Sequence, residues 1–506
     1  MNKTFKIILI SAIFLAAFAL RLYDFDDPPL DFHPARQMHS AIMARGFYLQ
    51  DGGYLKDHSP EYNTLAKILG SREAWIEPPI YEKLTAGLYH VFDSVDLRIP
   101  RFTSILFWLI GGIGLMLLTE ELLGTSGMLG ALCWYLFFPY GVIASRSFQP
   151  DIIMVCLLIW TMYLLKQWTA KPNSLGWAIA TGLCAGLCIL VKQVAAFPLG
   201  LAMAAGLISA NSLKKTLKNW RVWLAAVLTL APMLVYNYWG YFVKGFLVQQ
   251  YQGRFFLSEL IQPAFYIRWM RMIDQVFTIP LFFCALFGIL MIREKSSRIS
   301  WLAYFIGYIL YGLSLPHHIG THNYYQLLIF PFVAVGLGAL LKCGARAVMK
   351  ASRKQSRLTP VFGILFGIVL CGWWTAESIM TMHRNNYRAW PERWESWMPE
   401  LEPYENRTST IGSMDDYGGG MIYWGLHNPG IWDTSIESME GLDALIKLNT
   451  TFWNYKYLVV TNLNKFYEQP RLQRYLNETA EIYRQEPDYM IFELNKNSSS
   501  EWSSYD

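Results

Sequence analysis

The segment Asp31-Phe32-His33-Pro34-Ala35-Arg36-Gln37 places four kinds of polar side chain within seven consecutive residues. It supplies a carboxylate, an imidazole, a guanidinium and an amide. A carboxylate in such a setting can act as a general base toward a hydroxyl or an amine. Prolines at positions 28, 29 and 34 restrict the backbone and can fix the direction of the Asp31 side chain. A solvated loop aspartate is the alternative, and Asp24, Asp26 and Asp27 are rival candidates for the base.

Long apolar runs surround this segment and dominate the chain. Of its 506 residues, 53% are hydrophobic and 16% are charged, which excludes a single soluble domain. Runs of the length that crosses a bilayer occur at 7–23, 102–119, 126–143, 152–166, 175–191, 194–210, 221–239, 276–292, 299–315, 324–341 and 360–377. We therefore predict a polytopic α-helical membrane protein with about 11 transmembrane helices.

The placement of basic residues predicts the orientation. Lys and Arg are concentrated after the fourth, sixth and eighth apolar runs and in the loop 342–357. Positively charged short loops are typically cytoplasmic. The N-terminus should therefore be cytoplasmic, and the loop 24–100, the loop 240–275 and the tail after about residue 378 extracytoplasmic. We expect the inner (plasma) membrane, or the endoplasmic reticulum membrane in a eukaryote; the first run could also be a cleaved signal peptide.

This orientation brings polar residues from four separate segments to one side of the membrane. Ionisable groups near a bilayer are costly and commonly functional. The candidate binding residues are His33, Arg36, Gln37, Arg146, Asp151, Lys192, Gln193, His317, His318, His322, Tyr324 and Tyr325. A cation at a span end can instead snorkel to the interface, and Asp151 can cap the following helix. The histidines form no helical pair backed by an acid, so no metal site is predicted.

Two further regions have their own organisation. Residues 35–49 and a stretch after Glu77-Pro78-Pro79 have the apolar spacing of amphipathic helices within the first external loop. The tail contains apparent strands at 457–461 and 489–494 and helices at 438–449 and 470–478. We predict a transmembrane domain over 1–380 and a small external α/β domain over 385–506. The Gly-rich stretch 415–420 could be a phosphate-cradling turn or a plain flexible loop.

Several of these segments resemble the GT-C superfamily of polyprenyl-phosphate-sugar-dependent glycosyltransferases. The similarity is to the branch with the protein O-mannosyltransferases and lipid A aminoarabinose transferases, and it covers about 1–380. It lies in Arg21-Leu22, Glu77-Pro78-Pro79-Ile80-Tyr81, Leu97-Arg98-Ile99-Pro100-Arg101, Ser145-Arg146 with Pro150-Asp151, Gly186 to Lys192, and His322-Asn323-Tyr324-Tyr325. Two positions depart from the family pattern. Phe32 follows Asp31 where the family usually has an Asp-Glu pair, and Glu77 precedes the prolines where Lys or His is common.

The resemblance implies transfer of a sugar from a polyprenyl-phosphate carrier to a glycan, lipid or protein acceptor, with inversion and with Asp31 as general base. Cations such as Lys192, Arg146, Arg36 and the 317–322 histidines would stabilise the phosphate leaving group. No cofactor is required in this scheme, although a divalent metal is compatible with it. The expected partners are the donor, the acceptor and membrane lipids, with no nucleic acid. A transporter or flippase of lipid-linked sugars, a polysaccharide polymerase or ligase, and a non-catalytic scaffold are the alternatives.

Overall fold

The computed structural model describes residues 2–248, 256–351, 358–384, 386–401, 411–414, 418–439 and 441–494. These residues form two compact units. The helical unit comprises Met1–Phe25, Ala74–Tyr81 and Pro100–Asn386, and the α/β unit comprises Asp26–Glu73, Glu82–Ile99 and Tyr387–Asp506. Most of the loop 24–100, which the sequence predicts as part of the transmembrane domain, thus packs with the C-terminal tail.

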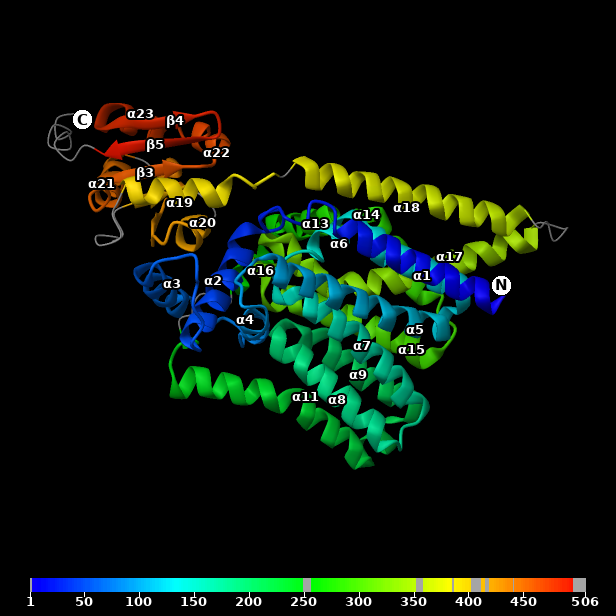
Figure 1. Ribbon diagram of the computed structural model, residues 1–506. Helices are drawn as coiled ribbons and strands as arrows, with labels where there is room; N and C mark the ends of the chain where they lie inside the picture. The colour runs from blue at the N-terminus through cyan, green and yellow to red at the C-terminus, as the bar shows by residue number, and fades with distance from the viewer. Residues whose placement is uncertain are drawn as a thin grey trace. The chain divides into compact units, whose positions relative to one another are not determined.

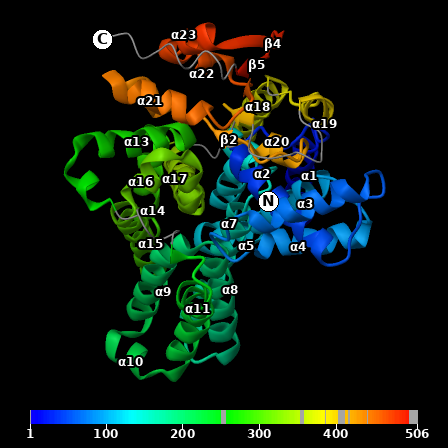
Figure 2. The ribbon, with the colours of Figure 1, turned by 90° about the vertical axis from the view of Figure 1, so that its left-hand side faces the viewer.

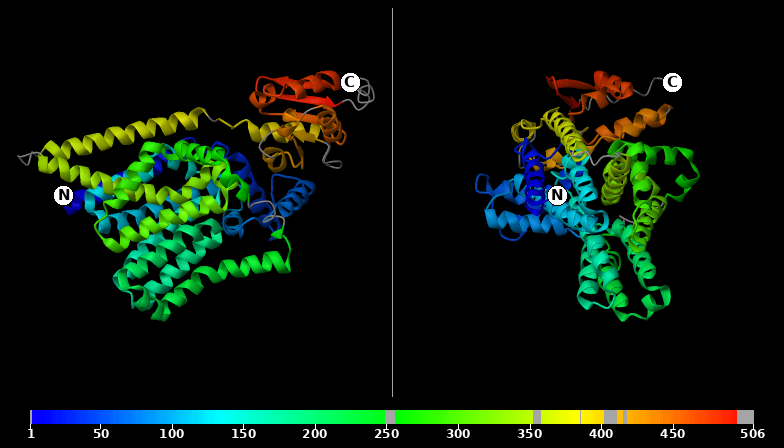
Figure 3. Two further views of the ribbon diagram at one scale, coloured as in Figure 1. Left: turned by 180° about the vertical axis from the view of Figure 1, so that it is seen from behind. Right: turned by 90° about the vertical axis from the view of Figure 1, so that its right-hand side faces the viewer.

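The helical unit is a bundle of apolar helices (Figure 1). Its helices are α1 (Lys3–Arg21), α5 (Arg98–Phe137), α6 (Pro139–Ala144), α7 (Pro150–Ala170), α8 (Leu175–Val191), α9 (Ala196–Asn211), α10 (Leu213–Lys218), α11 (Trp220–Tyr238), α13 (Pro263–Phe277), α14 (Ile279–Leu290), α15 (Lys295–Ser314), α16 (Pro316–Thr321), α17 (Phe330–Ala351) and α18 (Leu358–Arg384). Helix α8 packs between α7 and α11, and α9 packs against α15; Figure 2 shows α8, α9 and α11 running together. Figure 3 shows the same bundle from behind.

The polytopic helical fold is confirmed, but the number of clear membrane spans is lower than predicted. In the described residues, seven helices are long and apolar enough to cross a membrane, or eight if one bent pair counts as a span. Part of the difference is in α5, which contains the predicted span 102–119 and most of the span 126–143 and breaks at Gly124 (φ 71°). Trp108 of its first arm stacks on Tyr135 of its second, with centroids 4.5 Å apart, so the arms fold back on each other. Helix α8 has only 17 residues.

The predicted span 276–292 is interrupted, which is a correction to the sequence analysis. Helix α14 has only 12 residues, and α13 meets it at an angle of 83°. The break is at Thr278, whose φ of 63° lies in the left-handed region. Helix α13 is amphipathic, with Phe265, Trp269 and Phe277 among the residues on its buried face. This pattern is typical of a helix that lies along a surface rather than across a bilayer.

The basic segments predicted to be cytoplasmic come together at one end of the helical unit. Lys6 Nζ lies 2.8 Å from a carboxylate oxygen of Glu120. Lys166 Nζ lies 2.9 Å from Glu294, and Lys342 donates to the Leu122 carbonyl at 3.3 Å. These contacts group the N-terminal segment with the segments after the second, fourth, eighth and tenth predicted runs, and the side of the membrane on which they lie stays a prediction.

Close glycine contacts hold α14 against α17, and they allow a direct test of this packing. A Cβ on Gly288 would lie 1.8 Å from the Gly336 carbonyl oxygen, whereas a Cβ on Gly200 would meet nothing within 4 Å. We expect Gly288→Ala to lower the free energy of unfolding by about 1–3 kcal/mol, because the backbones must separate. Thermal unfolding in detergent would measure this. Gly200→Ala is the matched control, and an equal loss in both variants would contradict the close helix approach.

The α/β unit contains three helices from the first loop, α2 (Pro34–Gln50), α3 (Pro60–Arg72) and most of α4 (Ile80–Phe92). Helices α2 and α4 agree with the predicted ones, whereas α3 was not predicted. Helix α2 packs on α3 where Gly46 and Gly70 meet backbone to backbone. Twelve of the 17 residues of α2 are buried, so it is covered on most of its faces.

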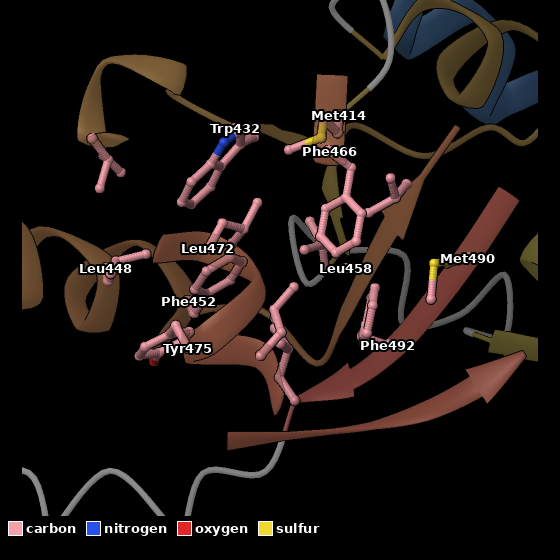
Figure 4. Close-up of a cluster of buried hydrophobic side chains, with 14 residues drawn as sticks. Met414, Trp432, Leu448, Phe452, Leu458, Phe466, Leu472, Tyr475, Met490 and Phe492 are labelled. Carbon is pink, nitrogen blue, oxygen red and sulfur yellow. The ribbon is translucent and has the colours of Figure 1, made fainter. Parts of the chain in front are cut away.

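The C-terminal part of this unit is an α/β domain, as predicted. Its helices are α19 (Trp390–Leu401), α20 (Gly419–Tyr423), α21 (Gly441–Phe452), α22 (Leu463–Tyr467) and α23 (Pro470–Thr479). The strands β1 (Ile411–Ser413), β2 (Gly430–Ile431), β3 (Tyr457–Val460), β4 (Ala480–Glu486) and β5 (Tyr489–Leu494) form a mixed sheet in the order β2-β1-β3-β5-β4. Strands β1–β3 pair in parallel, and β3, β5 and β4 pair antiparallel. Leu458 and Phe492 from the two central strands pack against Phe452 and Leu472 from the helices (Figure 4).

Candidate functional site

A buried ion cluster around Lys192 is the centre of the candidate site in the helical unit. The Lys192 ammonium lies 3.1 Å from Glu77 Oε1 and 3.2 Å from Asp151 Oδ2. Lys192 is 4% exposed and Asp151 is 1% exposed. One cation thus faces two carboxylates in a place that water scarcely reaches. Buried charges of this kind are costly and are a poor source of stability alone, which favours a functional role.

Two helix ends position Lys192 and Asp151. Lys192 is the extended residue that ends α8, and Asp151 lies in the first turn of α7, after a proline at its first position. The positive end of the α7 dipole favours a carboxylate there. The residue at the cap position is Gln149, and its side chain makes no cap bond. The alternative interpretation is that Asp151 caps α7. In the structure the cap position is two residues earlier, at Gln149, and Asp151 pairs with Lys192.

The segment that carries Glu77 is also held firmly. Tyr81 follows the two prolines and its hydroxyl donates to the Pro100 carbonyl at 2.7 Å. The same hydroxyl lies 2.6 Å from Ser104 Oγ, and the Trp75 ring meets Phe246 edge to face. In the sequence, Glu77 is distinguished only as a departure from a family pattern. The structure shows its consequence, because an acid at this position makes Lys192 part of a triad.

Aromatic and imidazole side chains adjoin the Lys192 cluster. The Lys192 ammonium is 5.8 Å from the ring centroid of Tyr324 and 6.0 Å from that of Tyr325, distances at which a cation attracts an aromatic face. His322 stacks on Tyr324 and His318 lies edge-on to Tyr325. The predicted residues from 151, 192 and 318–325 therefore lie together. They come from α7, α8, α16 and the 3₁₀ segment Asn323–Ile329.

A second ion cluster joins the 3₁₀ segment Leu257–Ile261 to α13 and α16. Glu259 forms an ion pair with Arg268, and its other oxygen lies 3.4 Å from His317 Nδ1. His317 was predicted, whereas Glu259 and Arg268 were missed. The signal that could have found Arg268 is its place as a charged residue on an amphipathic helix, between the apolar residues Phe265 and Trp269.

Gln193 connects the Lys192 cluster to a groove on the bundle surface. Its side-chain amide donates to Asn237 Oδ1 at 3.2 Å. Asn237 also lines a groove of about 540 Å³ whose other walls are Leu234, Tyr238, Tyr241 and Phe242. The groove lies at the end of α11 and in the π-helical turn Trp239–Val243. It is apolar apart from the amide and the phenol hydroxyls.

Arg146 is buried and holds the chain where it leaves α1. Its Nη2 donates to the Asp24 carbonyl at 2.8 Å, and its Nη1 contacts Met382 Sδ. Arg101 similarly donates to the Phe25 carbonyl at 3.3 Å. These contacts give Arg146 a clear structural role, whereas its binding of a phosphate stays a prediction.

In the α/β unit, the Asp31 segment is a tight turn before α2. The Gln37 side-chain amide donates to the Phe32 carbonyl at 2.7 Å. His33 precedes α2 with φ 49°, in the left-handed region. Its backbone carbonyl accepts a hydrogen bond from the backbone N–H of Arg36 at 3.0 Å. Gln37 thus acts on the shape of this turn, and Arg36 lies half-buried in the first turn of α2.

Two of the rival aspartates have other partners. Asp26 lies 3.0 Å from Arg98 in an exposed ion pair. Asp27 is 4% exposed and accepts the backbone N–H of Tyr387 at 2.7 Å. Both carboxylates therefore contact other parts of the α/β unit, and the choice of Asp31 as the base stays a prediction.

The apolar helices, the ion cluster buried at helix ends and the α/β tail define the class of this molecule as a polytopic membrane protein. Residues 76–239 match the family model described as dolichyl-phosphate-mannose-protein mannosyltransferase. This match includes Glu77, Asp151 and Lys192, and the GT-C resemblance inferred from the sequence is confirmed. No curated protein matches the sequence significantly.

Solved structures share this fold at low sequence identity. ArnT from Cupriavidus metallidurans bound to undecaprenyl phosphate is 13% identical, with a TM-score of 0.54 over 97% of this chain and 98% of that chain. The archaeal oligosaccharyltransferase AglB from Archaeoglobus fulgidus, in complex with an inhibitory peptide and a dolichol-phosphate, is 12% identical, with a TM-score of 0.53 over 96% of this chain and 74% of that chain. At such identities the likeness establishes the fold.

Proposed function

We propose that this protein is an integral-membrane glycosyltransferase that moves one sugar from a polyprenyl-phosphate carrier to a hydroxyl or amine acceptor on the extracytoplasmic side. The observation that carries the proposal is the buried Lys192, Asp151 and Glu77 cluster with its aromatic and histidine neighbours, at the ends of helices of a GT-C fold. The two lipid phosphates bound by the structural neighbours support the choice of donor.

The donor phosphate needs positive charge and hydrogen-bond donors where negative charge develops. Lys192 is already shared between two carboxylates, so it would bind a phosphate by exchanging one of them. Arg268, His317 and His318 are nearby donors along the same surface. In this proposal Asp151 and Glu77 hold the ammonium in place before the donor arrives, and one of them then contacts the sugar.

The lipid chain of the donor requires an apolar path. The groove along Leu234, Tyr238 and Phe242 has such a surface and connects to Gln193 through Asn237. These three apolar side chains are 62%, 63% and 72% exposed. We assign the isoprenoid chain to this groove because exposed apolar side chains there gain from contact with hydrocarbon.

Asp31 is the proposed general base. The acceptor oxygen or nitrogen attacks the anomeric carbon while the bond from that carbon to the phosphate oxygen breaks. The acceptor proton passes to the Asp31 carboxylate, and the bonding electrons leave with the lipid monophosphate. A single direct displacement inverts the configuration at the anomeric carbon, which NMR of the product would reveal.

The test is transfer by the purified full-length protein. Polyprenyl phosphates carrying radiolabelled mannose, aminoarabinose or other single sugars would be offered with glycan, lipid and peptide acceptors. We expect time-dependent release of free lipid phosphate together with labelled acceptor. Movement of intact donor across proteoliposome membranes without bond cleavage would instead support a flippase, and consumption of only diphosphate-linked donors would support a polymerase or ligase.

We also propose that the reaction needs no divalent metal, because protein cations can neutralise the phosphate. Transfer should stay within about twofold of its normal rate after EDTA treatment and buffer exchange. The measurement is the initial rate with and without added Mg²⁺ or Mn²⁺. A loss that only these ions restore would contradict the proposal and would assign Glu77 and Asp151 to a metal site.

A further inference from the structure

The glycine run at 418–420 forms a packed joint in the α/β unit. Gly418 has φ +67°, which a side chain rarely adopts. A Cβ on Gly419 would lie 2.6 Å from Met38 Cβ of α2, and a Cβ on Gly420 would lie 2.7 Å from Trp394 Nε1 of α19. The run therefore allows α20 to fit closely between α2 and α19. This packing accounts for the end of the stretch that the sequence predicts as a flexible loop or a phosphate turn, whereas residues 415–417 lie outside the described residues.

Arg45 of α2 binds the C-terminal end of α20, at Tyr423. Its Nη1 donates to the Tyr423 carbonyl at 2.5 Å, and its guanidinium lies 4.1 Å above the centroid of the Tyr423 ring. The side chain is 2% exposed. Hydrogen bonds from a charged donor are among the stronger ones in proteins, and a cation over a ring adds attraction when water is excluded. Burial and the nearby charge of Arg45 act in opposite directions on Tyr423, and burial dominates, raising the pKa of its phenol to about 12.

A second hydrogen bond to the tail lies on the N-terminal side of Asp31 in the sequence. The Asp27 carboxylate accepts the backbone N–H of Tyr387, at the start of the tail. Asp31 is thus bracketed in the sequence by two residues, Asp27 and Arg45, that are each hydrogen-bonded to the tail. Between them, the turn at Asp31 is fixed to α2 by Gln37.

We propose that the C-terminal domain positions the catalytic turn, and that Arg45 is the positioning residue through which α20 sets the placement of α2. This inference rests on the role of Asp31 in the proposed function. Arg45 contacts Tyr423 and acts on the reaction only through α2. A displacement of about 1 Å in a reacting group can reduce a rate by about 10²-fold without changing how the donor binds.

The test compares Arg45→Met, Arg45→Lys and Gly419→Ala with wild-type full-length protein. Arg45 Nε and Nη2 are buried and have no hydrogen-bond partner in the part of the chain that the structure describes. Methionine of similar length should therefore be tolerated by the fold. We expect Arg45→Met to lower kcat by about 10–100-fold while KM for the donor stays within about twofold. Lysine keeps the charge and should restore part of kcat, and Gly419→Ala should behave like Arg45→Met.

Gly87→Ala is the matched control, because a Cβ at this α4 glycine meets nothing within 4 Å; it should keep wild-type kcat. Hydrogen–deuterium exchange of the peptide covering residues 27–50 provides a readout independent of catalysis, and it should rise in Arg45→Met and Gly419→Ala but not in Gly87→Ala. Faster exchange with unchanged kcat, or lower kcat with unchanged exchange, would overturn the positioning role. Absence of transfer by the wild-type protein would refute the proposed function, while the exchange data would still test the joint.

Discussion

Replacing Asp31 with asparagine should lower kcat by about 10²–10⁴-fold, the usual contribution of a general base. Asparagine has nearly the same shape, so the turn that Gln37 holds through the Phe32 carbonyl should persist. KM for the donor should change little, because the lost function concerns the acceptor proton. Initial rates with a saturating labelled donor would measure the effect, and glutamate at position 31 should restore a fraction of it.

Asp26→Asn is the matched control for this experiment. It lies in the same loop, and its carboxylate takes part in an exposed pair with Arg98. Exposed pairs contribute little to stability, so this variant should keep nearly all of its activity. Full activity of Asp31→Asn would move the assignment of the base to another carboxylate, with Asp151 as the next candidate.

Replacing Lys192 with methionine should be the most damaging single change to the protein. It removes the cation that Asp151 and Glu77 share. Asp151 is only 1% exposed, so water cannot replace the lost ammonium. Removing one partner of a buried ion pair commonly costs about 3–5 kcal/mol. We expect a much shorter half-life at moderate temperature in detergent and no detectable transfer, measured on the same preparation.

A triple variant separates stability from function. Lys192→Met combined with Asp151→Asn and Glu77→Gln removes all three charges and keeps the volumes, so most of the lost stability should return. Transfer should not return if the cluster binds the donor. Recovery of both stability and activity in the triple variant would show that the cluster is only structural.

Sequence reasoning predicted the parts of this fold that have a strong pattern. The apolar runs predicted the helices of the bundle. Short runs of apolar and aromatic residues predicted β3 and β5 with almost the observed bounds. Strands β1 and β2 have only three and two residues, which is too short for any alternation to be seen. Strand β4 is mostly polar and exposed, as an edge strand often is. The bend at Thr278 was missed because a run of apolar residues continues through it.

The candidate site was predicted in its composition but not in its pairing. Asp151, Lys192, His318, His322, Tyr324 and Tyr325 are at span ends and do lie together. The ion pairs of Lys192 with Asp151 and Glu77 depend on where α8 ends, on where α7 begins and on how the Pro78-Pro79 segment packs. Such contacts between segments more than 40 residues apart leave no periodic signal. The role of Arg146 in holding the Asp24 carbonyl was hidden for the same reason.

The composition of the α/β unit has a consequence for the order of events during synthesis. The bond from Asp27 to Tyr387 spans 360 residues, and that from Arg45 to Tyr423 spans 378. The first loop therefore leaves the ribosome long before the residues that complete its packing. A nascent chain that ends before residue 387 has the helical bundle but lacks the tail contacts of Asp27 and Arg45. Under the proposed function, we therefore expect transfer only after the α/β tail has been translated and has folded.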